Sequence, residues 1–150
     1  MRTLAPHEAA ILDWLAPQQG AMLALLQEIV EIDSGSYDKA GVDAVGARLK
    51  RFFASEGLAT DTEPHASYGE AIHVLPAAPQ REAAHVVLLG HRDTVFAPGE
   101  ARARGFRLAD GRAYGPGVAD MKGGLVMNAL VLAAFKRFGG APAPVAALIT

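Results

Sequence analysis

A histidine and an aspartate stand two residues apart in the stretch LLGHRDTVFAPGE, residues 88–100. His91 and Asp93 directly follow the apolar run HVVLL, whose length and β-branched residues predict a strand buried on both faces. An imidazole and a carboxylate at the end of a strand can hold a metal ion, because both side chains are metal ligands. The same residue types also occur in ordinary polar turns, so the pair alone leaves both interpretations open.

A second carboxylate lies between two glycine clusters in the stretch GPGVADMKGG, residues 115–124. Asp120 comes directly before a predicted helix, and glycines there let the backbone pass close to a ligand. The alternative is that Asp120 only caps this helix. A phosphate-binding loop of the GxxxxGK[ST] type is excluded, because Lys122 is followed by Gly123 rather than by serine or threonine.

The composition limits the partners and metal ligands that the chain can have. Its 150 residues, 51% hydrophobic and 20% charged, are typical of one globular domain. The formal net charge of −2 gives no electrostatic reason to expect nucleic acid or an anionic membrane as a partner. The sequence contains no cysteine, so a metal must be held by histidine and carboxylates.

Predicted helices and strands alternate along the chain, which favours an α/β fold. In such folds ligands bind at the carboxyl ends of the strands, where His91 and Asp93 are placed. The predicted elements are helices over 7–32 (interrupted near Pro17 and Gly20), 42–53 and from 124 to 138, strands in 58–64, 71–77, 85–89 and 145–150, and a hairpin over 106–115 that turns at Asp110-Gly111.

The apolar segments give no sign of export or membrane insertion. Polar residues interrupt the N-terminal stretch MRTLAPHEAAILDWL, which therefore lacks the apolar core of a secretory signal. The apolar stretch 125–135 is shorter than the roughly 20 residues that span a bilayer. We therefore expect a cytoplasmic protein.

The order GHRDTV, hairpin, AYGPGVADMKGG resembles the motifs of the zinc-dependent aminoacylase and carboxypeptidase family. That family includes glutamate carboxypeptidase, acetylornithine deacetylase and succinyl-diaminopimelate desuccinylase. The stretch 31–58 resembles the family's opening helix-loop-helix, and its detail SGSYDKAGV is most similar to the glutamate carboxypeptidase branch. The resemblance covers nearly the whole chain. It implies the N-terminal half of a zinc-exopeptidase-like catalytic domain, with a mixed sheet flanked by helices.

The resemblance also implies a role for each matching residue. His91 would bind one zinc ion through a neutral ring nitrogen, and Asp93 would be a catalytic residue that orients His91 without touching metal. Asp120 would bridge two zinc ions, which together polarise a substrate carbonyl and lower the pKa of a water molecule. The peptide bond between Asp120 and Met121 is expected to be cis.

The family pattern continues beyond this chain. Its members are longer, and they supply a Glu-Glu pair, a further acidic ligand and a late histidine that we expect after Thr150. One glutamate of the pair is the general base. Residues 1–150 are therefore expected to be the N-terminal part of the catalytic, metal-binding domain, without its lid and dimerisation domain. The strand VAALIT is expected to lack neighbours and to leave an apolar edge.

The function implied is metal-dependent hydrolysis of an amide bond that releases an amino acid, as in a glutamate carboxypeptidase. The substrate would be a small peptide or an N-acyl amino acid, and the complete protein would form a homodimer through the domain absent here. The alternatives are a deacylase of the same family and a non-catalytic binding domain that keeps the front half of the fold. The 150-residue chain alone is expected to be inactive.

Other polar residues are expected to have structural or solvent-exposed positions rather than roles in the site. The role of Arg92, between the two key residues, stays open. The residues expected to have structural or solvent-exposed positions are His65, His73, His85, Arg102, Arg104 and Arg107.

Overall fold

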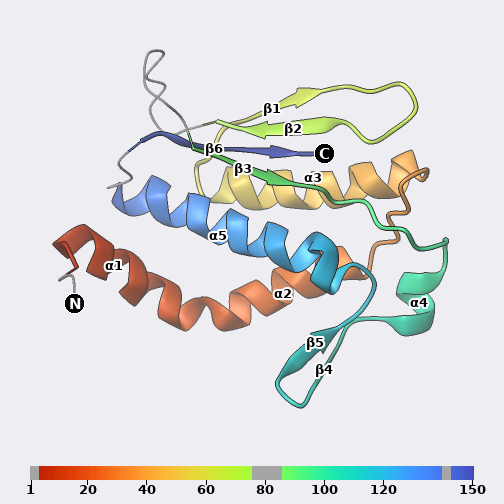
Figure 1. Ribbon diagram of the computed structural model, residues 1–150, viewed down its shortest axis with the longest axis horizontal. Coiled ribbons are helices and arrows are strands. Elements are labelled where there is room, and N and C mark those ends of the chain that lie inside the picture. The colour runs from red at the N-terminus through yellow and green to blue at the C-terminus, as the bar shows by residue number, and fades with distance from the viewer. Residues whose placement is uncertain (1–3, 76–85, 140–142) are drawn as a thin grey trace.

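The computed structural model describes residues 4–75, 86–139 and 143–150 and has one mixed sheet with helices packed against it (Figure 1). Helices α3 and α5 both contact the sheet, and α1 and α2 pack on α5. The elements are α1 (Pro6–Leu15), the 3₁₀ turn η1 (Ala16–Gln18), α2 (Gln19–Val30), α3 (Lys39–Ser55), β1 (Thr60–Glu63), β2 (Ala71–Val74), β3 (Val86–Gly90), α4 (Glu100–Arg104), β4 (Arg107–Ala109), β5 (Arg112–Tyr114), the π turn η2 (Val118–Lys122), α5 (Gly123–Phe138) and β6 (Val145–Ile149).

The main sheet has the strand order β1-β2-β6-β3, and β4 and β5 form a separate hairpin. Strand β2 is antiparallel to both β1 and β6, whereas β3 is parallel to β6. Gly90 pairs with Ile149, so the carboxyl ends of β3 and β6 lie at the same edge of the sheet. The predicted mixed α/β sheet flanked by helices is confirmed, and it places the residues after β3 where such folds bind ligands.

Most of the predicted elements are present, and local chemistry explains their limits. The N-terminal helical region is interrupted by η1, beside Pro17. Helix α3 begins earlier than predicted, because the Asp38 carboxylate accepts a hydrogen bond from the Gly41 amide at 3.1 Å and caps the helix. Asp110 and Gly111 have φ values of 51° and 72°, which are typical of a type I′ hairpin turn. The short helix α4 was not predicted.

Helix α5 forms the centre of the hydrophobic core. The segment Val118–Phe138 has 21 residues and contains an 18-residue window with a mean hydropathy of 1.5, so by length and composition it could cross a membrane. The sequence interpretation considered only residues 125–135, which are too short to do so. Its apolar character matches its position, because it packs between α1, α2 and the sheet. The buried side chains of α5 are Leu125, Val126, Ala129, Leu130, Leu132, Ala133 and Ala134.

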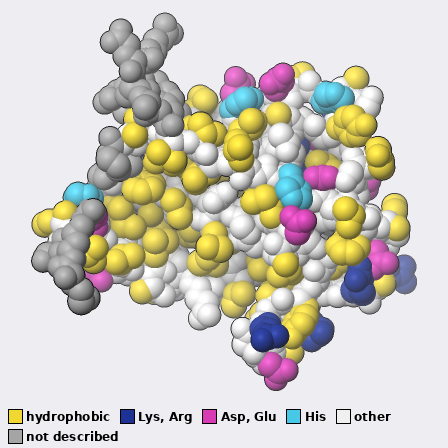
Figure 2. All heavy atoms as spheres, viewed as in Figure 1, with side chains coloured by type: hydrophobic (Ala, Val, Ile, Leu, Met, Phe, Trp, Pro, Cys, Tyr) yellow, Lys and Arg dark blue, Asp and Glu magenta, His cyan; other side chains and the backbone are white. Residues whose placement is uncertain are grey.

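Strand β3 is not buried on both faces, contrary to the prediction from its apolar run. It lies at one edge of the described sheet, and Leu89 remains 66% exposed, with Val86 and Val87 about half exposed. Within the described residues, β3 has a partner strand only on the β6 side. The expected bare edge at VAALIT is therefore also wrong, because β6 lies between β2 and β3. On the face of the molecule that Figure 2 shows, hydrophobic side chains gather over the part formed by α1, α5 and β3.

Candidate metal centre

Three polar side chains from two segments meet at the carboxyl end of β3. His91 and Asp93 follow β3 directly, and Asp120 lies in η2 immediately before α5. The Nδ1 atom of His91 is 3.0 Å from Oδ1 of Asp93, and its Nε2 atom is 2.9 Å from Oδ1 of Asp120. The structure therefore brings together the three residues selected from the sequence, with the imidazole held between two carboxylates.

The turn that carries Asp120 is anchored by a buried lysine. The side chain of Lys122 is completely buried, and its Nζ donates hydrogen bonds to the carbonyl oxygens of Ile29 at 2.8 Å and Ile32 at 2.9 Å. These carbonyls lie at the C-terminal end of α2, where a cation is stabilised by the helix dipole. Burial lowers the pKa of Lys122 to about 8, although the charge of Asp33 opposes this shift.

The backbone of the same turn is unusual at two positions. Gly117 has a φ of +76°, and a Cβ atom there would lie 2.7 Å from Cγ2 of Thr94, so this position requires glycine. The peptide bond between Asp120 and Met121 is cis, as the family resemblance predicts.

Arg92 connects the strand-end segment, residues 91–94, to α3, to β6 and to the residue before β2. Its side chain is completely buried. Its Nε donates to the carbonyl oxygen of Val42 in α3 at 2.9 Å, and its Nη1 donates to that of Ile149 in β6 at 3.1 Å. Its Nη2 donates to the carbonyl oxygen of Glu70 and lies 3.4 Å from Asp43 Oδ1. The role left open by the sequence is thus structural: Arg92 fixes the backbone between His91 and Asp93.

The charges around the imidazole favour its protonated form. Burial by itself lowers the pKa of His91, but the hydrogen bond to Asp120 and the negative charge of Asp93 outweigh it, so the pKa is raised. Both ring nitrogens face carboxylate oxygens, and an imidazolium can donate to both. A metal ion would have to displace the proton on Nε2, since histidine binds metals only in its neutral form.

The donor atoms fit part of a metal site. Zinc bonds to nitrogen and oxygen ligands are about 2.0–2.2 Å long. Nε2 of His91 and Oδ1 of Asp120, 2.9 Å apart, can therefore reach one ion. A carboxylate on the other ring nitrogen, as Asp93 provides, is the usual outer partner of a metal-bound histidine. Within the described ranges no group of three or more potential ligands is assembled. These residues would thus supply two ligands to a zinc ion, fewer than the three of a typical catalytic zinc.

The three residues open onto a cavity of about 280 Å³. Its other walls come from residues 94–96 and from the glycine-rich stretch 115–119. The side chain of Asp120 is 87% exposed, whereas those of His91 and Asp93 are 37% and 33% exposed. A substrate could therefore approach the carboxylate of Asp120 from solvent.

The other histidines and arginines considered in the sequence analysis that the structure describes lie outside this centre. His73 lies in β2 with Nε2 3.6 Å from Glu63, and Nδ1 of His65 accepts hydrogen bonds from two backbone amides of its own loop. His85 lies outside the described residues. Arg104 and Arg107 lie over the rings of Phe96 and Tyr114, and Arg102 is in the last turn of α4.

Comparison with known proteins finds similarity to peptidases. Residues 87–150 match the model of Peptidase family M20/M25/M40. Carboxypeptidase G2 from Pseudomonas sp. (strain RS-16) is 30% identical over 122 residues, which are 81% of this chain and 29% of that protein.

Solved structures of peptidases share the fold. Human carnosine dipeptidase 1 superposes with a TM-score of 0.78 at 18% identity, covering 99% of this chain and 35% of that one. The M20 family metallo-carboxypeptidase Sso-CP2 from Sulfolobus solfataricus gives a TM-score of 0.70 at 17% identity, covering 85% of this chain and 30% of that one. The chain thus spans about a third of the length of these relatives. The match of residues 87–150 to Peptidase family M20/M25/M40 and the identity with carboxypeptidase G2 confirm the resemblance to a peptidase family that the sequence motifs indicated.

Proposed function

We propose that the protein containing this chain is a metal-dependent exopeptidase that hydrolyses an amide bond and releases an amino acid. Residues 1–150 would be the N-terminal part of its catalytic domain. The observation that carries the proposal is the imidazole of His91, held between the carboxylates of Asp93 and Asp120 at the carboxyl end of β3. The peptidase-family match over residues 87–150 supports the same class of reaction.

In this proposal each residue of the centre has a separate task. His91 would hold a zinc ion through Nε2, and Asp120 would hold this ion together with a second one. Zinc ions, when bound, polarise the substrate carbonyl and lower the pKa of a water molecule. Asp93 would accept a hydrogen bond from the Nδ1–H group of His91, which keeps the lone pair of Nε2 directed at the metal. The general base and the other ligands come from residues after Thr150.

The proposed substrate is a small peptide with a C-terminal acidic residue, as for a glutamate carboxypeptidase. Support for carboxypeptidase action comes from the 30% identity with a protein named carboxypeptidase G2. The dipeptidase and metallo-carboxypeptidase names of two solved relatives support peptides in general. Glutamate itself is our inference from the sequence resemblance in residues 34–42.

The test compares two substrate classes on the protein that contains this chain. Its metal content is measured, and hydrolysis of a C-terminal glutamyl peptide and of an N-acetyl amino acid is assayed with and without a chelator. We expect zinc in the purified protein and release of glutamate that stops on chelation and returns with added zinc. Hydrolysis of the N-acetyl amino acid alone would favour the deacylase alternative. A folded protein that binds zinc but hydrolyses neither would favour a non-catalytic binding domain.

A second test uses residues 1–150 alone, for which we expect no turnover. Within the described residues, His91 and Asp120 lie together, and in this proposal both serve as metal ligands, so neither can also act as the general base. Loss of a general base by itself typically lowers the rate by about 10² to 10⁴-fold. Metal-dependent hydrolysis that follows the monodisperse 150-residue chain through purification would contradict this expectation, because the base would then lie within the chain.

A further inference from the structure

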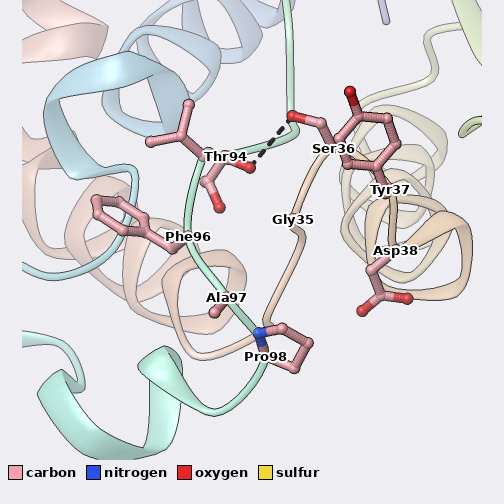
Figure 3. A pocket seen from close by; sticks show the side chains of 9 residues that line it. Gly35, Ser36, Tyr37, Asp38, Thr94, Phe96, Ala97 and Pro98 are labelled. Carbon is pink, nitrogen blue, oxygen red and sulfur yellow. Dashed lines mark hydrogen bonds between the residues drawn. The ribbon is translucent and has the colours of Figure 1, made fainter.

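Two segments far apart in the sequence run side by side beneath the candidate metal centre. Residues 34–36, between α2 and α3, lie parallel to residues 92–94 after β3, with a bridge between Gly35 and Thr94. The Thr94 amide donates to the Ser34 carbonyl oxygen at 2.7 Å, and the Ser36 amide donates to the Thr94 carbonyl oxygen at 3.0 Å. Figure 3 shows these segments side by side, with Ser36 directed toward Thr94.

The close approach of these segments depends on Gly35. A Cβ atom at this position would lie 2.8 Å from the carbonyl oxygen of Phe96, closer than real Cβ contacts allow. A serine follows on each side of this glycine. Ser34 is buried, and its hydroxyl donates to the carbonyl oxygen of Arg92 at 3.0 Å. One serine thus holds the backbone of the strand-end segment, and the other faces its carboxylate.

The hydroxyl of Ser36 donates to Oδ2 of Asp93, while the other oxygen of the same carboxylate faces His91. The Thr94 carbonyl oxygen, 3.3 Å from the hydroxyl, is a second available acceptor. A hydroxyl has one proton, and a bond to an ionised carboxylate is stronger than a bond to a neutral carbonyl. The proton of Ser36 therefore lies on the side of Asp93. Ser36, Asp93, His91 and Asp120 form one continuous line of contacts.

We propose that Ser36 is a positioning residue of the metal centre. The terminal torsion of an aspartate side chain is broad, so one partner does not fix the plane of its carboxylate. The imidazole engages one oxygen of Asp93 and Ser36 engages the other, which fixes the plane. The imidazole is then held in the rotation that directs Nε2 at Asp120. This inference rests on the proposed function, because it assumes that His91 binds the metal.

The surroundings of Ser36 decide which substitutions test its hydroxyl. The cavity beside it has a volume of about 610 Å³ and is lined by residues 35–38 and 94–98 (Figure 3). Water from this cavity could replace a missing hydroxyl, so Ser36→Ala would underestimate its contribution. Ser36→Thr and Ser36→Val have nearly the same shape, and only the threonine variant keeps the hydroxyl. This pair therefore separates the hydrogen bond from the added volume.

The experiment measures zinc affinity by competition with a chelator in the protein that contains this chain. We expect Ser36→Thr to bind zinc within about twofold of the unmodified protein, and Ser36→Val to bind about 5- to 10-fold more weakly, a loss below the 10- to 100-fold typical of a direct partner of a metal-bound histidine. Ser36→Ala should give an intermediate loss, and it replaces the valine variant if that variant does not fold. Equal affinities of the threonine and valine variants would overturn the inference.

Two further variants identify the source of any loss. Ser34→Ala removes a hydroxyl from the same paired segments without touching Asp93, so we expect a lower melting temperature but zinc affinity within about twofold of the unmodified protein. If Ser34→Ala weakened zinc binding as much as Ser36→Val, general loosening of the segments would be the cause, and the positioning role would be refuted. Unchanged zinc binding by His91→Ala would overturn the proposed function and this inference together. Loss of zinc in that variant with no effect at Ser36 would overturn the inference alone.

Discussion

The two halves of the candidate metal centre are held in different ways. In the strand-end half, the side chains of His91 and Asp93 are about one-third exposed, and Asp93 contacts both Ser36 and His91. In the helix-start half, the carboxylate of Asp120 is 87% exposed, and among the described residues its contact is with His91. The backbone below Asp120 is nevertheless fixed, because Lys122 is buried against the end of α2.

The two halves of the centre therefore fix different parts of the structure. The strand-end half fixes a side chain, the imidazole, through a series of polar partners. The helix-start half fixes only a backbone position and leaves its carboxylate open to solvent. An exposed carboxylate loses little of its hydration until it meets a cation, and a carboxylate that is to hold metal ions must be accessible to them from solvent. Substitutions of Asp120 and of Lys122 should therefore separate metal binding from stability within the helix-start half.

The largest effect is expected for Asp120→Ala. The variant should lose zinc and all measurable hydrolysis, while its free energy of unfolding without metal changes by less than about 0.5 kcal/mol, because the side chain is an exposed surface group. Metal analysis, peptide assays and denaturant unfolding measure these quantities. His91→Ala should lose zinc in the same way, and His73→Ala is the matched control that should keep it. Full activity with normal zinc content in either the Asp120 or the His91 variant would refute the ligand assignment.

A smaller loss is expected for Asp93→Asn. The amide keeps the size of the side chain but removes the charge that Asp93 places beside Nδ1 of His91. Removal of such a partner typically costs about 10- to 100-fold in metal affinity or activity. Chelator competition and steady-state kinetics would measure the change. A variant that binds zinc as tightly as the unmodified protein would indicate that the strand-end half does not depend on its polar partners.

Lys122→Met should reduce stability rather than chemistry. Methionine keeps much of the side-chain volume but leaves the carbonyl oxygens of Ile29 and Ile32 without the buried ammonium. Leaving a buried polar group without its partner costs about 1–3 kcal/mol. Denaturant unfolding gives the value, and Lys136→Met, at an exposed position near the end of α5, is the matched control. Equal stabilities of the two variants would show that Lys122 does not anchor the turn.

The smallest effect is the loss, at low pH, of the hydrogen bonds that the half-buried carboxylate of Asp33 accepts. Hydrogen bonds from the Ala101 and Gly99 amides, both 2.8 Å long, lower the pKa of Asp33 below its ordinary value of 3.8. Because the folded state holds this proton less tightly than the unfolded state, the stabilisation is present above about pH 3.8 and is lost as the pH falls through the lower folded value. The protection factors of the Gly99 and Ala101 amides, which compare the observed exchange rate with the intrinsic rate at the same pH, should therefore fall in acid.

The control for this acid effect is Asp33→Asn, which should show fast exchange at both amides at neutral pH and no further change attributable to residue 33 in acid. Exchange at Gly99 and Ala101 that has the same pH profile in the variant and in the unmodified protein would contradict the assignment.

The family resemblance predicted the meeting of His91, Asp93 and Asp120, and element order explains it. A residue after a strand of an α/β sheet and a residue before the helix that returns to that sheet both lie near the same edge. The family resemblance then supplied the roles, which stay predictions. The hairpin at Asp110-Gly111 was equally predictable from the sequence, since its turn requires residues that tolerate positive φ.

The buried cations could not be predicted in the same way. Lysine and arginine are mostly exposed, and nothing within a few residues of Arg92 or Lys122 reveals that distant carbonyl oxygens surround them. The error at β3 has a related cause. An apolar run indicates that a strand is suited to burial, but it does not indicate which neighbouring elements cover the strand. Both features depend on contacts distant in sequence.

The pairing of residues 34–36 with residues 92–94 also has a consequence for how the protein folds. Ser36 and Asp93 are 57 positions apart, and His91 and Asp120 are 29 apart. Contacts between such distant positions require the closure of long loops, whose entropic cost is met only when much of the fold has formed. A peptide covering residues 88–124 would contain the three polar residues of the centre but not Ser36. Such a peptide would leave the imidazole free to rotate, and uptake of metal during refolding should follow the formation of the core rather than precede it.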